Sequence, residues 1–223
     1  MNSKPELKLD WCSHQAAKYA VEHWHYTEKM PVNKLVKIGV WEDGKFIGVI
    51  IFGVGASAVI HKQFAVGRFE VAELVRIALK DHRATVSRMV AIALRMVRRS
   101  NPKLRVLVSF ADPSEGHNGG IYQAGGWIYT GRSQPTIEYF YNGDWRHVTD
   151  VYKRTTNTVI RQLPNRKKQG KYRYVMPLDA AMRQQIELLR QPYPKRVRSV
   201  DGDTPAIHAG EGGSIPTRTL TDK

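Results

Sequence analysis

The fold is decided by the stretch from Glu70 to Ala111, which runs EVAELVRIAL (residues 70–79), KDHRA (80–84), TVSRMVAIALRMVRR (85–99), SNPK (100–103) and LRVLVSFA (104–111). Apolar residues recur at helical spacing in the middle segment, whereas the first and last segments are short apolar runs of strand length. The stretch therefore predicts a strand, a loop, a helix and a buried strand. Such a crossover unit joins strands of a mixed α/β sheet.

Further elements are predicted on both sides of this unit. An amphipathic helix is expected over residues 10–23, with Ser13 as its cap, and a hairpin is expected over residues 34–52. A short helix over residues 119–124 and strands over residues 127–130 and 136–141 follow. The sequence thus predicts an α/β fold with a mixed, mostly antiparallel sheet, flanking helices and a basic C-terminal extension.

Positive charge is concentrated near the C-terminus. The 223 residues carry a net charge of +15, and residues 132–198 contain 15 Lys and Arg against 5 Asp and Glu. We divide the chain into a catalytic core over residues 1–135, a basic DNA-contacting extension of strands and helices over residues 136–198, packed on or near the core, and a disordered tail over residues 199–223. A charge of this size attracts polyanions, which makes nucleic acid the leading partner.

The sequence favours a soluble cytoplasmic protein. No apolar run approaches the roughly 20 residues of a membrane span, so no membrane partner is expected. The N-terminus lacks a signal peptide, and the single cysteine, Cys12, excludes an intramolecular disulfide. The oligomeric state stays open.

Several motifs resemble one family in order and content. They are Trp24-His25-Tyr26 followed by Met30-Pro31, Glu73 to Leu79 (ELVRIAL), Ser109 to Pro113 (SFADP) with Gly116-His117, Ile121 to Ala124 (IYQA), and Trp127 to Gly131 (WIYTG). Over residues 10–178 the chain resembles the Mom family of bacteriophage DNA adenine-modification proteins, with a GNAT-like acyltransferase fold. The resemblance implies an acyltransferase-like enzyme that performs adenine methylcarbamoylation, forming N6-carbamoylmethyladenine. This anti-restriction modification would protect phage DNA in the host cell cytoplasm.

The resemblance leaves the donor open. The usual GNAT loop at the helix start is rich in glycine, which lets backbone N–H groups approach the pyrophosphate of coenzyme A. Here residues 83–88 read RATVSR and contain no glycine. The donor is either an acyl-type compound such as acetyl-coenzyme A or a glycine-derived compound, and the latter fits the carbon and nitrogen count of the product better.

Four residues are expected to carry the chemistry. His25 is suited to proton transfer near neutral pH, and Tyr26 adjoins it. Asp112 ends a buried strand, where it can orient a histidine, accept a proton or bind metal. Tyr122 resembles the general acid of GNAT enzymes. Each has a structural alternative, which is aromatic packing for His25 and Tyr26, turn capping for Asp112 and a core position for Tyr122.

The resemblance also implies binding residues. The expected donor contacts are Arg76, Arg83, Ser87 and Ser109, although Arg76 can instead pair with Glu73 and Ser87 can cap a helix. Iron is a further option, with His25, Asp112 and His117 as its nitrogen and oxygen ligands. The expected DNA contacts are Arg166, Lys167, Lys168, Lys171 and Arg173. Because N6 lies on the base-pairing edge, the adenine must be flipped out or single-stranded.

Two rival functions remain. One is a coenzyme A-dependent N-acetyltransferase that acts on a protein or a small amine, against which the glycine-free loop argues. The other is a non-catalytic DNA-binding protein with an acyltransferase-like fold.

Overall fold

The computed structural model describes residues 4–32, 34–54 and 59–195, so the tail expected over residues 199–223 lies outside the described residues. The strands are β1 Leu7–Trp11, β2 Leu35–Glu42, β3 Lys45–Gly53, β4 Val71–Leu79, β5 Val106–Ala111, β6 Ile128–Arg132, β7 Thr136–Tyr141, β8 Asp144–His147, β9 Asn165–Lys168 and β10 Tyr172–Pro177. The helices are α1 His14–Trp24, α2 Val86–Ser100, α3 Gly120–Ala124, α4 Val148–Tyr152, α5 Asn157–Ile160 and α6 Ala180–Glu187, with 3-10 turns η1 Ile60–Phe64 and η2 Pro113–Glu115.

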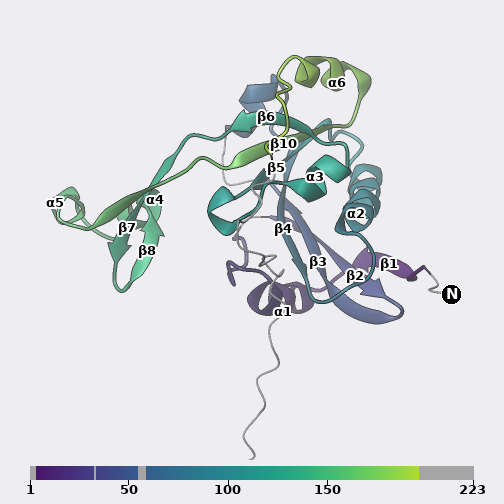
Figure 1. Ribbon diagram of the computed structural model, residues 1–223, viewed down its shortest axis with the longest axis horizontal. Coiled ribbons are helices and arrows are strands. Elements are labelled where there is room, and N and C mark those ends of the chain that lie inside the picture. Colours follow the sequence, from purple (N-terminus) through teal and green to yellow (C-terminus); the bar gives the residue numbers. More distant parts are fainter. Residues whose placement is uncertain (1–3, 33, 55–58, 196–223) are drawn as a thin grey trace, which may run out of the picture.

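The main sheet has seven strands in the order β1-β2-β3-β4-β5-β10-β6 (Figure 1). Strands β4 and β5 are parallel and are connected through α2, whereas the other strand pairs of the described residues are antiparallel. The predicted crossover unit is therefore confirmed. The GNAT-like order of strand, loop, helix, strand, short helix and strand is confirmed with it, as is the mixed, mostly antiparallel sheet.

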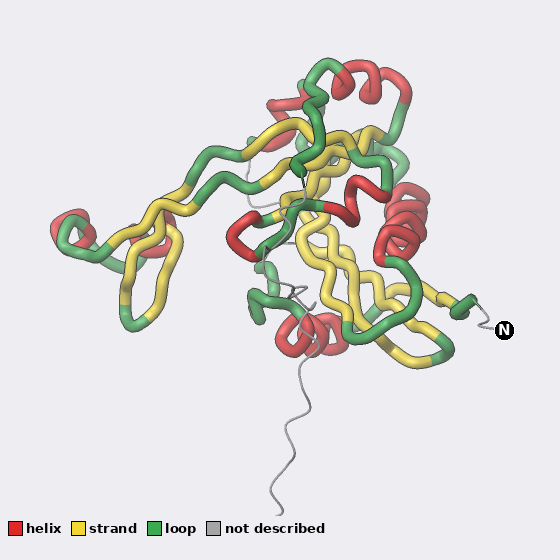
Figure 2. The backbone as a smooth tube through the Cα atoms, viewed as in Figure 1, coloured by secondary structure: helices red, strands yellow, loops and turns green. Residues whose placement is uncertain are grey.

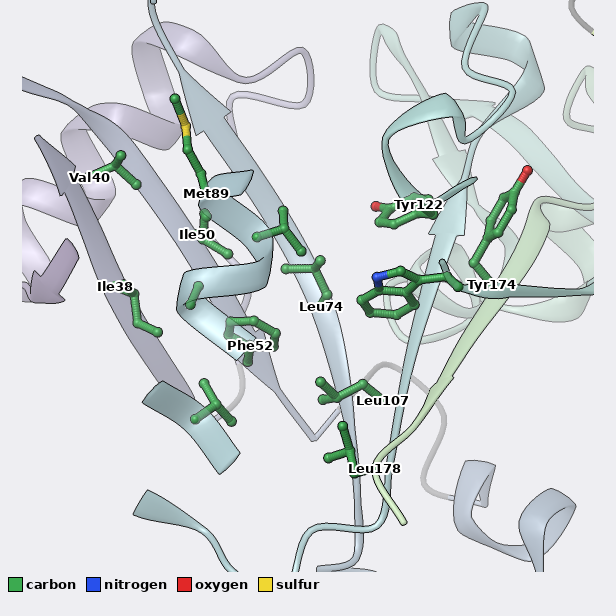
Figure 3. Close-up of a cluster of buried hydrophobic side chains, with 14 of the residues drawn as sticks. Ile38, Val40, Ile50, Phe52, Leu74, Met89, Leu107, Tyr122, Tyr174 and Leu178 are labelled. Atoms are coloured by element: carbon green, nitrogen blue, oxygen red, sulfur yellow. The ribbon is translucent and has the colours of Figure 1, made fainter. Parts of the chain in front are cut away.

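Helices cover both faces of this sheet. On one face, Met89 and Ala93 of α2 pack with Phe52, Leu74 and Leu107 of three adjacent strands (Figure 3). On the other face, α1 covers β3 and β4, while α6 and η1 cover the part of the sheet around β5, β6 and β10. Alternate residues of β3 and β5 thus enter different cores, which explains why both strands are continuous apolar runs.

The N-terminal helix begins later than the sequence predicts. Ser13 is its N-cap, accepting a hydrogen bond from the Ala16 N–H at 3.1 Å, as expected. Residues 10 and 11, however, belong to β1, which pairs with β2. Edge-strand pairing of this kind depends on a partner about 30 residues away and leaves little local pattern.

The sequence groups residues 136–198 as one extension, and the described part of it, residues 136–195, is distributed between two parts of the structure. Strands β8, β7 and β9 form a small three-stranded sheet that, together with α4 and α5, projects from the main body (Figure 2). We call residues 136–168 the arm. Strand β10, by contrast, inserts between β5 and β6, because Tyr174 and Val175 are fully buried in the main cores.

Strands β4 and β5 part halfway along their length. Their pairing runs from Val71 opposite Val106 to Leu74 opposite Ser109. Beyond this point β4 continues beside β3, and β5 continues beside β10. A register shift leaves Val75 as an extra residue between Leu74 and Arg76, and such a bulge re-aims the side chains that follow it.

None of the helices within the described residues combines the length and the apolar character needed to cross a membrane.

Substitution of Gly119 tests the packing around β10. Gly119 has φ +80°, and a Cβ atom there would lie 2.1 Å from the Tyr174 ring, whereas Gly126 has φ +72° and open space around it. In both alanine variants the free energy of unfolding should fall by about 1–2 kcal/mol, because alanine is strained in the left-handed backbone conformation. In Gly119→Ala it should fall by about 2 kcal/mol more, because the buried Tyr174 must shift. Urea unfolding measures both, and equal losses would contradict the close approach.

Candidate functional site

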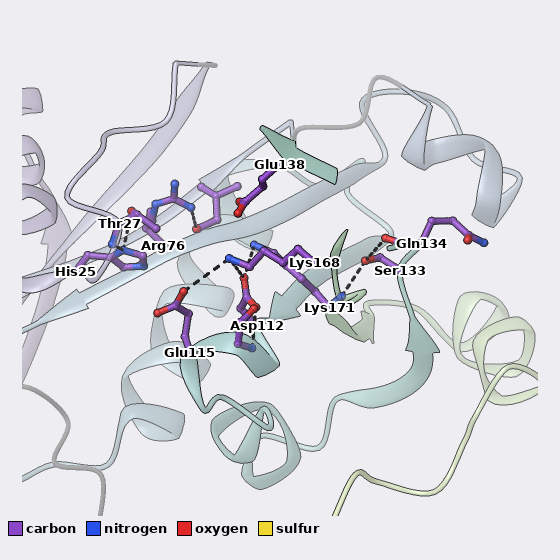
Figure 4. Close-up of polar contacts among 12 residues, drawn as sticks. His25, Thr27, Arg76, Asp112, Glu115, Ser133, Gln134, Glu138, Lys168 and Lys171 are labelled. Carbon is purple, nitrogen blue, oxygen red and sulfur yellow. Dashed lines mark hydrogen bonds and ion pairs between the residues drawn. The ribbon is translucent and has the colours of Figure 1, made fainter. Parts of the chain in front are cut away.

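Four chain segments meet where β4 and β5 part (Figure 4). The loop after α1 supplies His25 and Tyr26, β4 supplies Arg76, the end of β5 supplies Asp112, and the turn between β9 and β10 supplies Lys171. The two regions that the sequence identified separately, the imidazole and phenol pair and the strand-ending carboxylate, thus lie together. The structure also adds cations around them.

His25 is a neutral hydrogen-bond donor. Its Nδ1 accepts the backbone N–H of Thr27 at 3.1 Å, and Thr27 Oγ1 lies 2.9 Å from the same nitrogen. Because a backbone N–H only donates, the ring proton is assigned to Nε2. Burial, reinforced by the charges of Arg76, His117 and Lys171, lowers the pKa of His25 to about 3. His25 is expected from the sequence to accept a proton. In the neutral ring only Nδ1 can do so, and Nδ1 already accepts the Thr27 N–H.

Tyr26 presents an aromatic face next to His25. The two rings are stacked with centroids 4.4 Å apart, and the His117 ring meets Tyr26 edge-on at 5.5 Å. Half of Tyr26 remains exposed, at 50%. Burial, followed by the charge of Asp112, raises the pKa of the phenol, so Tyr26 is neutral. Such a partly exposed ring is suited to stacking on a planar ligand.

Asp112 is a buried carboxylate with several partners. It caps η2 by accepting the Ser114 N–H at 3.1 Å and hydroxyl at 2.6 Å, so its capping role is confirmed. Lys171 Nζ lies 3.1 Å and Lys168 Nζ 3.4 Å from the carboxylate. Burial alone would raise the pKa of Asp112, but the Ser114 hydrogen bonds and Lys171 outweigh it and lower the pKa to about 2.

Tyr122 belongs to a hydrogen-bonded chain in the core. Its hydroxyl lies 2.7 Å from Ser109 Oγ, and Ser109 donates to the Leu74 carbonyl at 2.8 Å. Since a carbonyl only accepts, the Tyr122 hydroxyl donates to Ser109. Burial raises the pKa of Tyr122 to about 12, which keeps its proton in place. The chain ends at the last paired residues of β4 and β5.

Arg76 lies on β4 just beyond the last residue paired with β5, and its guanidinium is only partly satisfied. Its Nη1 donates to the Val75 carbonyl at 2.7 Å, while its Nε is buried without a hydrogen-bond partner. Burial lowers the pKa of Arg76. A buried N–H without a partner costs free energy, so this atom is a candidate ligand contact.

The loop before α2 is occupied from within. The buried Glu42 carboxylate accepts the backbone N–H groups of Arg83, at 2.9 Å, and Ala84, at 2.7 Å. The Arg83 guanidinium pairs with Asp43. Ser87 Oγ lies 3.5 Å from Thr85 Oγ1, and Thr85, not Ser87, is the N-cap position. Arg83 and Ser87 therefore face a different local environment from Arg76 and Ser109.

The five residues expected to contact DNA are not equivalent. Lys168 and Lys171 bind Asp112, and Arg173 donates to Thr130 and Gln63 within the main body. Arg166 pairs with Glu138 at 2.7 Å and lies over the Trp145 ring, while Lys167 is exposed. A hollow of about 470 Å³ beside Asp112 is lined by Pro113, Ser114, Glu115, Arg166, Lys167, Lys168 and Gln169.

The iron ligand set is not assembled. Over residues 4–32, 34–54 and 59–195, no group of three His, Cys, Asp or Glu side chains is arranged to hold a metal ion. His25, Asp112 and His117 do not form such a group, and the Asp112 carboxylate is directed to Ser114, Lys168 and Lys171 instead.

Thr27, Glu42 and Glu115 were missed from the sequence. Glu115 pairs with Lys168 at 3.7 Å, and Thr27 fixes the His25 tautomer. Thr27 follows His25 by two residues, the spacing of a local side-chain to backbone hydrogen bond, so a signal for it existed. Nothing local connects Glu42 to a loop 41 residues away.

The chain is similar to known proteins over most of its length. The model of the Mom protein family matches residues 6–195. The methylcarbamoylase Mom of Escherichia phage Mu is 26% identical over 204 residues, covering 85% of this chain and 84% of the relative. Two solved structures are similar: aminoglycoside acetyltransferase AAC(6')-Ib in complex with coenzyme A and kanamycin, at TM-score 0.47 and 11% identity over 82% of this chain and 98% of that one, and FeeM, an N-acyl amino acid synthase from uncultured soil microbes, at TM-score 0.47 and 13% identity over 81% and 94%.

The neutral state of His25 makes stability depend on pH. An unfolded chain takes up the His25 proton near pH 6.5, whereas the folded protein takes it up only near pH 3. Between these values the unfolded state binds more protons, so stability falls as the pH is lowered and this loss ends below the folded pKa. The slope of the unfolding free energy against pH is proportional to the number of protons taken up on unfolding. His25→Gln should reduce this number by up to one.

Urea unfolding across this pH range measures the slope. The exposed His14 provides the matched variant, His14→Gln. Identical slopes in the wild-type protein and His25→Gln would contradict a buried neutral imidazole.

Proposed function

The chain belongs to the Mom protein family, and from this premise we propose that it is a transferase that modifies the N6 amine of adenine in DNA. The product would be N6-carbamoylmethyladenine, formed on phage DNA in the host cytoplasm and protecting it from restriction. The observation that carries the proposal is the meeting of the His25 and Tyr26 loop with Asp112 where β4 and β5 part. The donor is acyl-type or glycine-derived.

The adenine would be held by the loop after α1. Its ring would stack on the face of Tyr26 that the His25 ring leaves free, with the imidazole packed behind the phenol. Thr27 supports this arrangement by holding Nδ1 of the imidazole. Only a flipped-out or single-stranded adenine can reach such a position with its base-pairing edge free.

Asp112 and its lysines would couple DNA binding to proton transfer. When N6 forms its new bond to carbon, it loses a proton, and Asp112 would accept it. In the absence of DNA the carboxylate is held by Lys168 and Lys171, which makes it a weak base. Phosphates of a bound strand compete for these ammonium groups, and loss of its counterions makes Asp112 more basic. As the new bond forms, the bond between the transferred carbon and the rest of the donor breaks, and Tyr122, which is protonated beforehand, would give its proton to the departing group.

The basic arm would hold the strand next to the target. The hollow beside Asp112 has Arg166, Lys167 and Lys168 along one side, and Lys168 also contacts Asp112. Phosphates in this hollow would place the neighbouring nucleotide close to Tyr26. The arm, together with Lys171, would then contact DNA. Arg173, which is engaged with Thr130, would instead support β10.

Nucleoside mass spectrometry of plasmid DNA from cells that express the chain tests the activity. A heavier deoxyadenosine is expected, and Asp112→Asn should reduce it by about 100-fold or more, the usual contribution of a proton-transfer group. The matched control is Asp179→Asn, because Asp179 likewise caps a helix and pairs with a cation, Arg105, but lies away from the site. Its modified fraction should equal that of the wild-type protein.

Unmodified adenine with the wild-type chain would instead favour a non-catalytic DNA-binding protein. Acetylation of a protein or small amine without a DNA product would favour the N-acetyltransferase.

Removal of Lys167 tests the arm. Lys167→Ala should weaken DNA binding for all sequences and reduce the slope of log affinity against log salt by about 1. Lys103→Ala is the control, because Lys103 is also exposed but lies outside the arm. Fluorescence anisotropy over a salt series measures both, and an unchanged slope for Lys167→Ala would remove this residue from the DNA surface.

A further inference from the structure

The loop just before α2 already holds an anion, and that anion is part of the chain. Glu42 at the end of β2 is 7% exposed, and its two oxygens accept the N–H groups of Arg83 and Ala84 at 2.7–3.2 Å. Ala84 is itself 5% exposed, so the contact lies inside the protein. Backbone N–H groups in the loop that leads into a helix are a usual binding place for a phosphate, and here a carboxylate occupies two of them, just ahead of the N-cap Thr85.

Charge around this loop opposes a phosphorylated ligand. A phosphate at the Arg83 and Ala84 amides would have to displace a buried carboxylate. The Arg83 guanidinium, which could neutralise a phosphate, pairs with Asp43. Glu42 and Asp43 together place two carboxylates beside this loop, which disfavours a phosphate there.

A second observation shows where a ligand oxygen is wanted. Arg76 Nε is buried and has no hydrogen-bond partner, and the guanidinium lies where β4 and β5 separate, near His25 and Tyr26. An N–H group excluded from water and unpaired is destabilising until an acceptor arrives. A carbonyl or carboxylate oxygen is an acceptor of the right kind. A hydrogen bond from a charged guanidinium to such an oxygen is stronger than one from a neutral N–H group.

We propose that the donor is a small carbonyl- or carboxylate-bearing compound, received by Arg76, and not a coenzyme A-type nucleotide anchored at the start of α2. This inference rests on the proposed function, because it names the donor class for the same site. Glu42 serves as a built-in anion that occupies the Arg83 and Ala84 N–H groups of the loop before α2. The donor therefore depends on contacts near Arg76.

Two measurements on the full chain test the proposal. In the first, coenzyme A and acetyl-coenzyme A are titrated into the wild-type protein by calorimetry, with amide hydrogen exchange followed at Arg83 and Ala84. No saturable binding below about 1 mM and no added protection are expected. Tight binding of either compound, with protection of these amides, would show that Glu42 is displaced and would overturn the inference.

In the second, Arg76→Gln is compared with Arg95→Gln, which removes an exposed arginine of α2. Arg76→Gln should lose adenine modification by about tenfold or more while keeping its unfolding midpoint and its DNA affinity, and Arg95→Gln should lose nothing. Full modification by Arg76→Gln would overturn the role of Arg76. If the wild-type chain modifies adenine and still binds coenzyme A tightly, the function stands and this donor class fails. If it modifies no adenine, the function itself fails.

Discussion

The hydrogen bond from Ser109 to the Leu74 carbonyl marks the last residues at which β4 and β5 are paired. The rest of the site depends on this point. Below it the two strands form a continuous core with Leu74 and Leu107 beneath α2. Above it the strands follow different partners, with Arg76 on β4 beside β3 and Asp112 just after β5 beside β10. Because Tyr122 binds the same Ser109 hydroxyl, the core fixes the point at which the strands separate.

Electrostatics connects the two parts of the molecule. Asp112 is buried at 2% exposure, and a carboxylate so deep needs partners to stay ionised. Lys168, at the end of the arm, and Lys171, just before β10, provide them. The residues expected to meet DNA phosphates thus also control the charge state of the proposed proton acceptor. Under the proposed function, strand binding and chemistry would share the same two ammonium groups.

A shared architecture does not fix the ligand. The crossover from β4 through α2 to β5 is the arrangement in which a helix start can receive a phosphate. In this chain Glu42 takes two amides of the loop before that helix, while Arg76 keeps an unpaired N–H. Under the proposed function, these few side chains would decide which donor can be bound. His25 illustrates the same principle, since one backbone N–H from Thr27 turns an expected base into a hydrogen-bond donor.

The sequence by itself determined the elements whose causes are local. The helical spacing of α2, the apolar runs of β3 and β5, the Ser13 cap and the turn at Asp43-Gly44 all follow from neighbouring residues. The resemblance of its motifs also pointed to His25, Asp112 and Tyr122. In the structure, Tyr26 beside His25 contacts His117, which follows Asp112 by five residues, and Tyr122 binds Ser109 near the end of β5. Only the tertiary structure decided that β10 inserts between β5 and β6, that Lys171 binds Asp112, and that Glu42 fills the loop before α2. Each of these contacts joins residues about 40 or more positions apart, and their free energy depends on burial and charge that exist only after the chain has folded.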